Sequence, residues 1–313
     1  MSLDVIAAFL NAMEAEGIRP LKSIADDLPD GNWVRFRVEG DKPGRENGWA
    51  RLRLTNRPHG HFGHFRLGIS AFWRPDGGTA PLTPNERRDI ALELRRNEAE
   101  RRKANEVAAG MALELWNRAK EADPAHPYLQ GKGLSPFGIR QRGQELLVPM
   151  WDASFRLWNV QRIRRDYQNK RFLKGGRTAG LFWAWATHWA DGRASDGPLV
   201  IAEGYGTAAA IHEATGFAVV AAMTVKNLAT VADAMHRMFP SRDIIIAADY
   251  DGHLARNIGL ETAQEAARRI NAAVAIPAPQ CPSVGLKIDF ADLRRSEAAA
   301  IIEATRTKAI SYD

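Results

Sequence analysis

Two short apolar runs, each ending in acidic residues, constrain the fold of this chain more than any other feature. The first covers residues 198–202 and is followed by Glu203 and Gly204. The second covers residues 244–248 and is followed by Asp249-Tyr250-Asp251-Gly252. Short apolar runs that are bounded by Gly or Pro and lie among helical patterns are typical of buried parallel strands.

The acids that end these runs are expected to meet. Ligands of parallel α/β sheets bind outside the carboxyl ends of the strands, so both acidic clusters fall on the same edge of one sheet. Three carboxylates in one place repel each other unless a hard cation lies among them, and Mg²⁺ or Mn²⁺ prefers such oxygen ligands. The pattern therefore predicts a divalent metal site at Glu203, Asp249 and Asp251.

The order of these motifs resembles a Toprim domain, the metal-binding fold of bacterial-type primases, type IA and II topoisomerases and some nucleases. More narrowly, Glu203-Gly204-Tyr205-Gly206-Thr207-Ala208 is similar to the Glu-Gly-Tyr-Ala-Thr-Ala signature of plasmid conjugation primases and satellite-phage primase-helicases. Only Gly206 departs from that signature. Cellular replicative primases carry a further acid at the position of Thr207, whereas the plasmid and phage proteins also have Thr there.

The Toprim pattern continues to the end of the chain. Residues 259–273 have helical periodicity, and residues 274–276 form the next expected strand. The following stretch, residues 285–293, resembles the third acidic motif of the primase Toprim domain. The resemblance makes Asp289 a further metal neighbour and leaves Asp292 as an alternative N-cap of the terminal helix.

Upstream of this region the resemblance is to primases alone. Residues 125–135 resemble the start of the primase polymerase domain, and residues 146–182 resemble its small basic subdomain. Independently of that resemblance, cations interleaved with aromatic residues between positions 156 and 177 suit phosphates and unstacked bases. The residues expected to bind nucleotide or template are Arg162, Arg164, Lys170, Arg171 and Lys174. The alternative is an ordinary basic hairpin.

The N-terminal part of the chain has a different sequence pattern. A helical pattern over residues 3–13 is followed, from about residue 32 to residue 76, by apolar and polar residues that alternate with period two. This alternation predicts an antiparallel sheet with one polar face. That face carries arginines beside exposed aromatic residues, so it is either a single-strand binding platform or a solubilising face over an aromatic core.

The run His59-Gly60-His61-Phe62-Gly63-His64 also invites a zinc interpretation. Structural zinc sites usually include thiolates, and the only cysteine of the chain is Cys281. We therefore expect no zinc and interpret this stretch as a glycine-rich turn between strands. Residues 86–120 are expected to form a charged helix with many i,i+4 ion pairs, which is either a solvated bridge or a helix that tracks DNA.

Charge and composition limit the class of protein. The chain has a net charge of +6, but residues 198–313 contribute −2 and residues 1–197 contribute +8. A basic front half beside an acidic metal-binding half suits an enzyme that handles polyanions. One cysteine excludes a disulfide framework, and the absence of a long apolar run predicts a soluble, cytoplasmic protein without membrane contact.

Together these patterns predict an α/β Toprim fold, a parallel-stranded sheet flanked by helices, preceded by a basic α+β subdomain and a mostly β N-terminal module. The expected divisions are a β module at 1–80, a helical linker at 81–125, the basic subdomain at 126–197 and the Toprim domain at 198–313.

The resemblance implies a DNA primase of mobile-element type that joins ribonucleotides on single-stranded DNA. In its two-metal scheme, Asp249, Asp251 and Asp289 hold cations, and Glu203 binds a metal or accepts the hydroxyl proton. Its implied partners are single-stranded DNA, ribonucleoside triphosphates, and a separate helicase or relaxase. The alternatives are a Toprim nuclease and a non-catalytic DNA-binding accessory.

Overall fold

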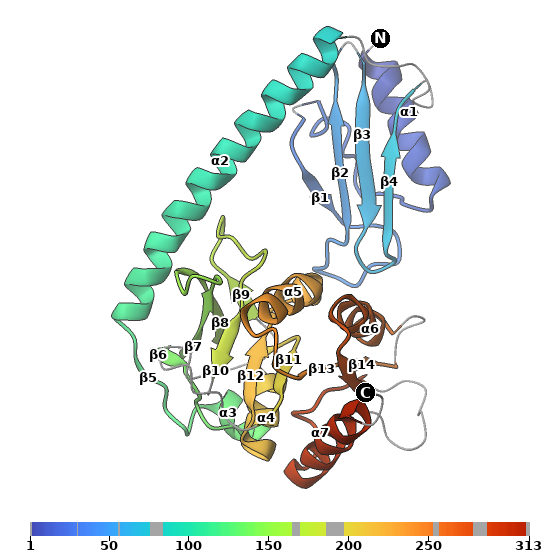
Figure 1. Ribbon diagram of the computed structural model, residues 1–313. Coiled ribbons are helices and arrows are strands. Elements are labelled where there is room, and N and C mark those ends of the chain that lie inside the picture. Colours follow the sequence, from blue (N-terminus) through green and yellow to red (C-terminus); the bar gives the residue numbers. More distant parts are fainter. Residues whose placement is uncertain are drawn as a thin grey trace. The chain divides into compact units, whose positions relative to one another are not determined.

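The computed structural model describes residues 2–29, 31–55, 57–75, 84–164, 170–185, 197–252, 257–277 and 287–310. The chain divides into two compact units, Met1–Glu93 and Leu94–Asp313 (Figure 1). The helix α2 (Pro84–Asn117) runs through the boundary between them. No helix in the described ranges has both the length and the apolar character needed to cross a membrane.

The first unit is one helix on a four-stranded antiparallel sheet. After α1 (Ser2–Ala15) come β1 (Val34–Phe36), β2 (Gly48–Arg53), β3 (His59–His64) and β4 (Ile69–Trp73), paired in that order. The helix buries Ile6, Phe9 and Met13, which are spaced three and four residues apart and so share one stripe. The strands β1, β2 and β4 lie in stretches where the alternating pattern predicted strands, whereas residues 65–68 of the same pattern form a turn.

The histidine run is strand β3 and not the turn that its glycines suggested. Gly60 and Gly63 are required because of close packing. A Cβ atom at Gly60 would overlap the ring of Phe9, and one at Gly63 would overlap the ring of Trp49 and the backbone of Ile69. Glycine in a strand interior often marks such a close approach, which is the signal that the turn interpretation missed.

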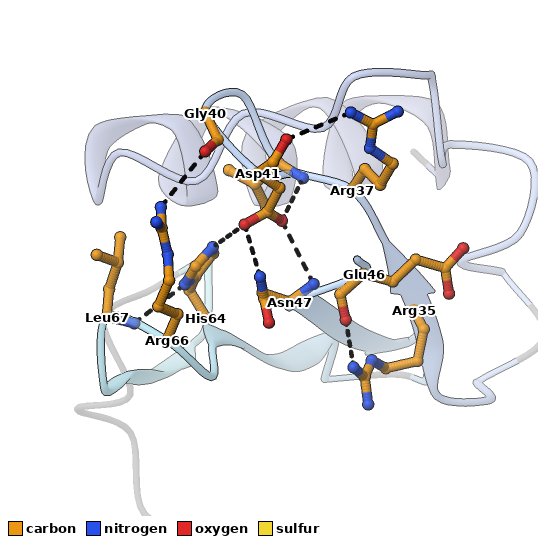
Figure 2. Close-up of polar contacts among 10 residues, drawn as sticks. Arg35, Arg37, Gly40, Asp41, Glu46, Asn47, His64, Arg66 and Leu67 are labelled. Carbon is orange, nitrogen blue, oxygen red and sulfur yellow. Dashed lines mark hydrogen bonds and ion pairs between the residues drawn. The ribbon is translucent and has the colours of Figure 1, made fainter. Parts of the chain in front are cut away.

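His64 in this strand is a buried structural residue (Figure 2). Its Nδ1 accepts a hydrogen bond from the Leu67 N–H at 3.1 Å, so the proton is on Nε2, which lies 3.3 Å from Asp41 Oδ1. Asp41 also accepts hydrogen bonds from the Val38 N–H and from the side chain of Asn47. Among the described residues, no group of three His, Cys, Asp or Glu side chains is placed to hold a metal ion, and the zinc-free state stays a prediction.

The second unit contains an antiparallel sheet and a mainly parallel one. The antiparallel sheet has the order β5-β6-β7-β8-β9, with α3 (Pro127–Lys132) between its first two strands in the chain. Its strands are β5 (Lys120–Glu121), β6 (Arg140–Arg142), β7 (Glu145–Trp151), β8 (Leu157–Arg164) and β9 (Lys170–Phe172).

The parallel sheet confirms the central expectation from the sequence. Its order is β10-β12-β11-β13-β15, in which β11 (Leu199–Ala202), β12 (Ala218–Ala221), β13 (Ile244–Ala247) and β15 (Ala273–Ala275) are parallel. Only β10 (Trp183–Trp185), at one edge, is antiparallel to its neighbour. A small antiparallel pair, β14 (Tyr250–Asp251) and β16 (Lys287–Ile288), lies beyond β13 in the chain.

Helices cover both faces of the parallel sheet (Figure 1). The helices α4 (Tyr205–Thr215) and α7 (Arg295–Ile310) share one core cluster, which also includes the inner face of the antiparallel sheet. The helices α5 (Leu228–Met238) and α6 (Ile258–Ile270) share the second cluster, on the opposite face. A short 3₁₀ helix, η1 (Val225–Asn227), leads into α5.

The long helix α2 is only partly the solvated bridge that its charges predicted. Its C-terminal turns bury Ala108, Ala109 and Ala112, and Ala112 packs with Val160 of β8. Glu106 on the same part of the helix forms an ion pair with Arg156. The last turns of α2 therefore pack against the antiparallel sheet of the second unit.

Candidate active site

The predicted acids follow the carboxyl ends of two neighbouring parallel strands. Glu203 comes directly after β11, and Asp249 follows β13 after Ala248. Asp251 belongs to β14, and Asp289 follows β16, which pairs with β14. The parallel pairing and the small β14–β16 ladder thus bring four acids from three chain segments to one edge of the sheet.

The charges of these acids influence one another. Burial raises the pKa of Asp249 to about 7, and the negative charges of Glu203 and Asp289 add to that rise. Burial also raises the pKa of Glu203, against the opposing effect of Lys287 and of a hydrogen bond from the Val225 N–H. The ionised forms of Asp249 and Glu203 are therefore poorly stabilised by hydration.

The donor set suits a hard divalent cation. All of its candidate ligands are carboxylate oxygens, and the buried, mutually repelling charges are what such a cation would neutralise. No three of the acids in the described part of the chain are close enough to bind one ion together. That spacing is compatible with Mg²⁺, which usually takes one or two protein carboxylates and completes its shell with water and substrate phosphate.

Three lysines lie around the acids, and two of them, Lys132 and Lys287, were not among the predicted site residues. Lys287 Nζ lies 3.5 Å from Asp251 Oδ1. Lys132 Nζ lies 3.3 Å from Asp289 Oδ2 and 2.9 Å from Asp292 Oδ1. Both lysines lay in stretches that resembled primase motifs, but only the fold shows that residues 132 and 289 meet.

Lys170 is the predicted nucleotide-binding residue that does reach the acids. Its ammonium lies 5.4 Å from the centre of the Tyr128 ring. Burial lowers the pKa of Lys170, and the positive charge of Lys132 lowers it further, while Asp289, Asp249 and Glu203 oppose that fall. The side chain of Lys170 is exposed, so Lys170 is an accessible cation near the acidic cluster.

The other predicted cations divide between the two faces of the antiparallel sheet. Lys170 pairs with Ile163, whose side chain is in the core shared with the parallel sheet, whereas Arg171 pairs with Arg162. Because successive side chains of a strand point to opposite faces, Arg162, Arg164 and Arg171 lie on the face away from Lys170. Glu145 binds both Arg162 and Arg164, at 2.7 Å and 2.9 Å. Lys174 is exposed in the loop after β9.

Asp292 is not the helix cap that the sequence left open. Its Oδ2 accepts the Asp289 N–H at 3.0 Å, and its Oδ1 binds Lys132. At the start of α7, the carboxylate of Glu297 accepts hydrogen bonds from the backbone N–H and the side chain of Arg294. Asp292 thus holds the loop that carries Asp289, together with Lys132.

The glycine at the start of α6 allows this helix to approach the acids at the sheet edge. A Cβ atom at Gly259, at the start of α6, would lie 2.5 Å from the Asp249 carbonyl oxygen and 3.0 Å from Asp251 Oδ2. Instead, the Gly259 N–H donates to Asp251 Oδ2 at 3.1 Å. Asn257 caps the helix and accepts the Asp251 N–H at 3.0 Å. Sequence analysis missed both residues, although Asn followed by a helical pattern is an N-cap signal.

The signature around Glu203 is explained by its neighbours. At Gly206 a Cβ atom would lie 2.8 Å from the Tyr128 hydroxyl, which accounts for the departure from Ala in the signature. The Tyr205 hydroxyl donates to the Ser135 carbonyl at 3.4 Å. Thr207, where cellular primases have an acid, is buried with its hydroxyl 3.5 Å from Asp249 Oδ1.

The loop after β12 is fixed by a buried residue that the sequence did not single out. Asn227 Nδ2 donates to the carbonyls of Thr178 and Ala222 at 2.6 Å and 3.1 Å, and its Oδ1 accepts the Gly180 N–H. This loop supplies the Val225 N–H that binds Glu203. Asn227 therefore positions the backbone around the first acid.

Comparison with known proteins agrees with this geometry. Residues 198–300 match the family described as the Toprim domain. These residues are a Toprim domain. The match covers Glu203, Asp249, Asp251 and Asp289, and it ends within α7.

The similarity to characterised proteins extends beyond the Toprim domain. The chain is 32% identical over 281 residues to DNA primase TraC of Escherichia coli, and 33% identical over 282 residues to another protein of that name from the same organism. Both matches cover 86% of this chain, which spans 26% of the length of the first relative and 19% of the second. Among solved structures, the DnaG primase catalytic domain bound to ssDNA has a TM-score of 0.44 at 15% identity, covering 67% of this chain and 80% of that one.

Proposed function

We propose that this chain is the catalytic part of a DNA primase, which makes short RNA primers on single-stranded DNA during replication or conjugation of a mobile element. The observation that carries this proposal is the extent of the similarity to TraC. It covers 281 residues and therefore reaches well beyond residues 198–300. A Toprim domain alone would serve a nuclease equally well, whereas the basic antiparallel sheet would add a place for template and triphosphate.

Each group at the sheet edge has a role in this proposal. Asp249 and Asp251 would hold Mg²⁺ or Mn²⁺ with help from Asp289. A bound cation would acidify the primer 3′-hydroxyl and stabilise the negative charge that develops on the phosphates. Glu203 is half-buried and has a raised pKa, so it is suited either to bind a cation or to accept the hydroxyl proton.

The lysines would act on the triphosphate. Lys170, Lys132 and Lys287 lie among the acids, and ammonium groups bind phosphate oxygens as point charges. An incoming triphosphate would offer Lys132 and Lys287 phosphate oxygens in place of the carboxylates that they now contact. Arg162, Arg164 and Lys174 remain candidates for the template backbone, on the other face and in the loop of the antiparallel sheet.

Primer synthesis on single-stranded DNA tests the proposal directly. The full chain is incubated with varied templates, labelled ribonucleotides and Mg²⁺ or Mn²⁺, and the expected products are short labelled RNAs. Asp249→Asn and Asp251→Asn each remove an anionic ligand, so product should fall by about a hundred-fold or more, because hard cations need charged oxygens. Single-stranded DNA binding should persist in both variants.

Asp243→Asn is the matched control. Asp243 directly precedes β13, whereas Asp249 lies beyond its other end, so the control should retain full activity. Loss of template DNA without RNA products would instead identify a nuclease. DNA binding without products on any template would favour an accessory protein.

A further inference from the structure

Among the described residues of the first unit, α1 covers one face of the sheet, and the other, the open face, carries exposed aromatic side chains. The helix α1 packs on the covered face, where Phe9 contacts Phe62 and Trp73 with ring centroids 5.6 Å and 5.3 Å apart. In β2 the buried positions are Gly48, Ala50 and Leu52, and the positions between them are only half-buried. The residues of the open face are Arg35, Trp49, Arg51, Arg53, His59, His61 and Phe72, which the strand register places together.

Two further aromatic rings from the connecting segments extend the open face. Trp33 lies 5.4 Å from Trp49, and Trp49 lies 6.0 Å from Phe65, measured between ring centroids. Trp33, Phe65 and Phe72 are 56%, 58% and 52% exposed. None of these rings belongs to the core cluster of this unit, so the core does not explain them.

Arginines lie directly against these rings. The Arg35 guanidinium is 4.5 Å from the centre of the Phe65 ring, and that of Arg51 is 5.6 Å from the centre of the Trp33 ring. The four strands contain no Asp or Glu at any position. Flat exposed rings and cations therefore alternate on a surface whose strands carry no carboxylate to repel phosphate.

We propose that this open face is a second site for single-stranded DNA, on which bases stack on Trp33, Phe65 and Phe72 while Arg35 and Arg51 contact phosphates. Four-stranded sheets with aromatic residues on an uncovered face bind single strands in this way. Bases within a duplex have no free faces, so duplex DNA would gain only the phosphate contacts. This second site goes beyond the proposed function. It rests on that function in one respect, namely that the bound single-stranded DNA is the template for primer synthesis.

Photo-crosslinking of the full chain locates this site. A single-stranded oligonucleotide with photoreactive deoxyuridines is bound, irradiated and mapped by mass spectrometry, and the expected cross-links fall on Trp33, Phe65 or Phe72. Asp249→Asn should keep these cross-links while it abolishes synthesis, so failure of the proposed function and failure of this site are separate results. Cross-links confined to residues 126–310 would overturn the proposal.

Affinity and its salt dependence test the two kinds of contact. The double variant Trp33→Ala/Phe65→Ala should weaken single-strand binding about ten-fold or more, since each stacked base contributes substantially. Arg35→Gln/Arg51→Gln should reduce the slope of log affinity against log salt by about 1.4, or about 0.7 for each lost phosphate contact. Thermal melting checks that every variant is folded.

Matched controls come from the segment that follows α1 in the same unit. Leu21 is 48% exposed, and Arg19 forms an ion pair with Glu14 of α1. Leu21→Ala and Arg19→Gln should change affinity by less than about two-fold. Equal losses in the controls and in the aromatic variant, or equal competition by duplex DNA or by an acidic polypeptide, would show that the face is only a basic surface and would overturn the site.

Discussion

Two carboxylates of this protein, Asp41 and Asp249, have opposite electrostatic environments, which are set by their neighbours. Asp41 accepts hydrogen bonds from the Asn47 side chain and from backbone N–H groups, which lower its pKa to about 2 despite its burial. At Asp249, burial and then the negative charges of Glu203 and Asp289 raise the pKa to about 7, and the bond from Thr207 is a marginal one at 3.5 Å. The first environment holds a fixed charge for structure, and the second leaves a charge for a ligand to neutralise.

The Asp41 network predicts an acid-sensitive step in stability. Its folded pKa lies below its ordinary value of 3.8, so the unfolded state takes up the proton first as pH falls. The stabilisation is complete above about pH 4 and should disappear between about pH 4 and pH 2. Asp41→Asn should therefore lower Tm by several degrees at pH 7, and the difference from the native chain should shrink toward pH 2.

Thermal melting of both chains across this pH range is the measurement, with Asp26→Asn as the control. Asp26 is an exposed acid in the same unit, and its substitution should leave Tm nearly unchanged at every pH. A difference between Asp41→Asn and the native chain that stays constant down to pH 2 would contradict the assigned role of the carboxylate.

At the scale of elements, the sequence predicted what depends on strand direction and failed where register or packing decides. The acids after β11 and β13 could be placed together because parallel strands end at one edge. The glycines of β3 were misinterpreted because a glycine that avoids a ring looks, in sequence, like a glycine in a turn. The partners of Lys132 could not be found, because no local pattern relates residue 132 to residues 289 and 292.

Register also divides the basic segment, and this division can be tested with adjacent residues of β9. Lys170 faces the acids and Arg171 faces away. If Lys170 binds the incoming triphosphate, Lys170→Gln should raise the KM for ribonucleotides or lower kcat by about ten-fold or more, since it removes a charge-assisted contact. Steady-state primer synthesis at varied nucleotide concentration measures both constants.

Arg171→Gln removes the same charge one residue away and should change both constants by less than about two-fold. A larger effect of Arg171→Gln on DNA affinity would fit a template role for the outer face. Equal kinetic defects in the two variants would show that the segment acts as one undivided patch, as the sequence alone suggested.

For the whole molecule, the two units have separate cores. The core of the first unit is built from residues 6–62, whereas every buried core residue of the second lies between 108 and 302. Each core can therefore lose its packing without exposing the other, and chains built in this way often unfold in more than one step. The boundary between the two units, after Glu93, falls within the predicted linker at 81–125, and the predicted divisions and their functions stay predictions.

Separate cores predict separate melting transitions in scanning calorimetry. Phe9 is fully buried between α1 and the sheet, and Met235 is fully buried in α5. Phe9→Ala removes a core ring at a cost of about 3–5 kcal/mol, so it should lower the transition of the first unit by about 10 °C or more and leave the other in place. Met235→Ala, at about 2–5 kcal/mol, should do the reverse. If both variants instead shift one shared transition, the two units unfold as a single cooperative body, and the continuous helix α2 would be the element that couples them.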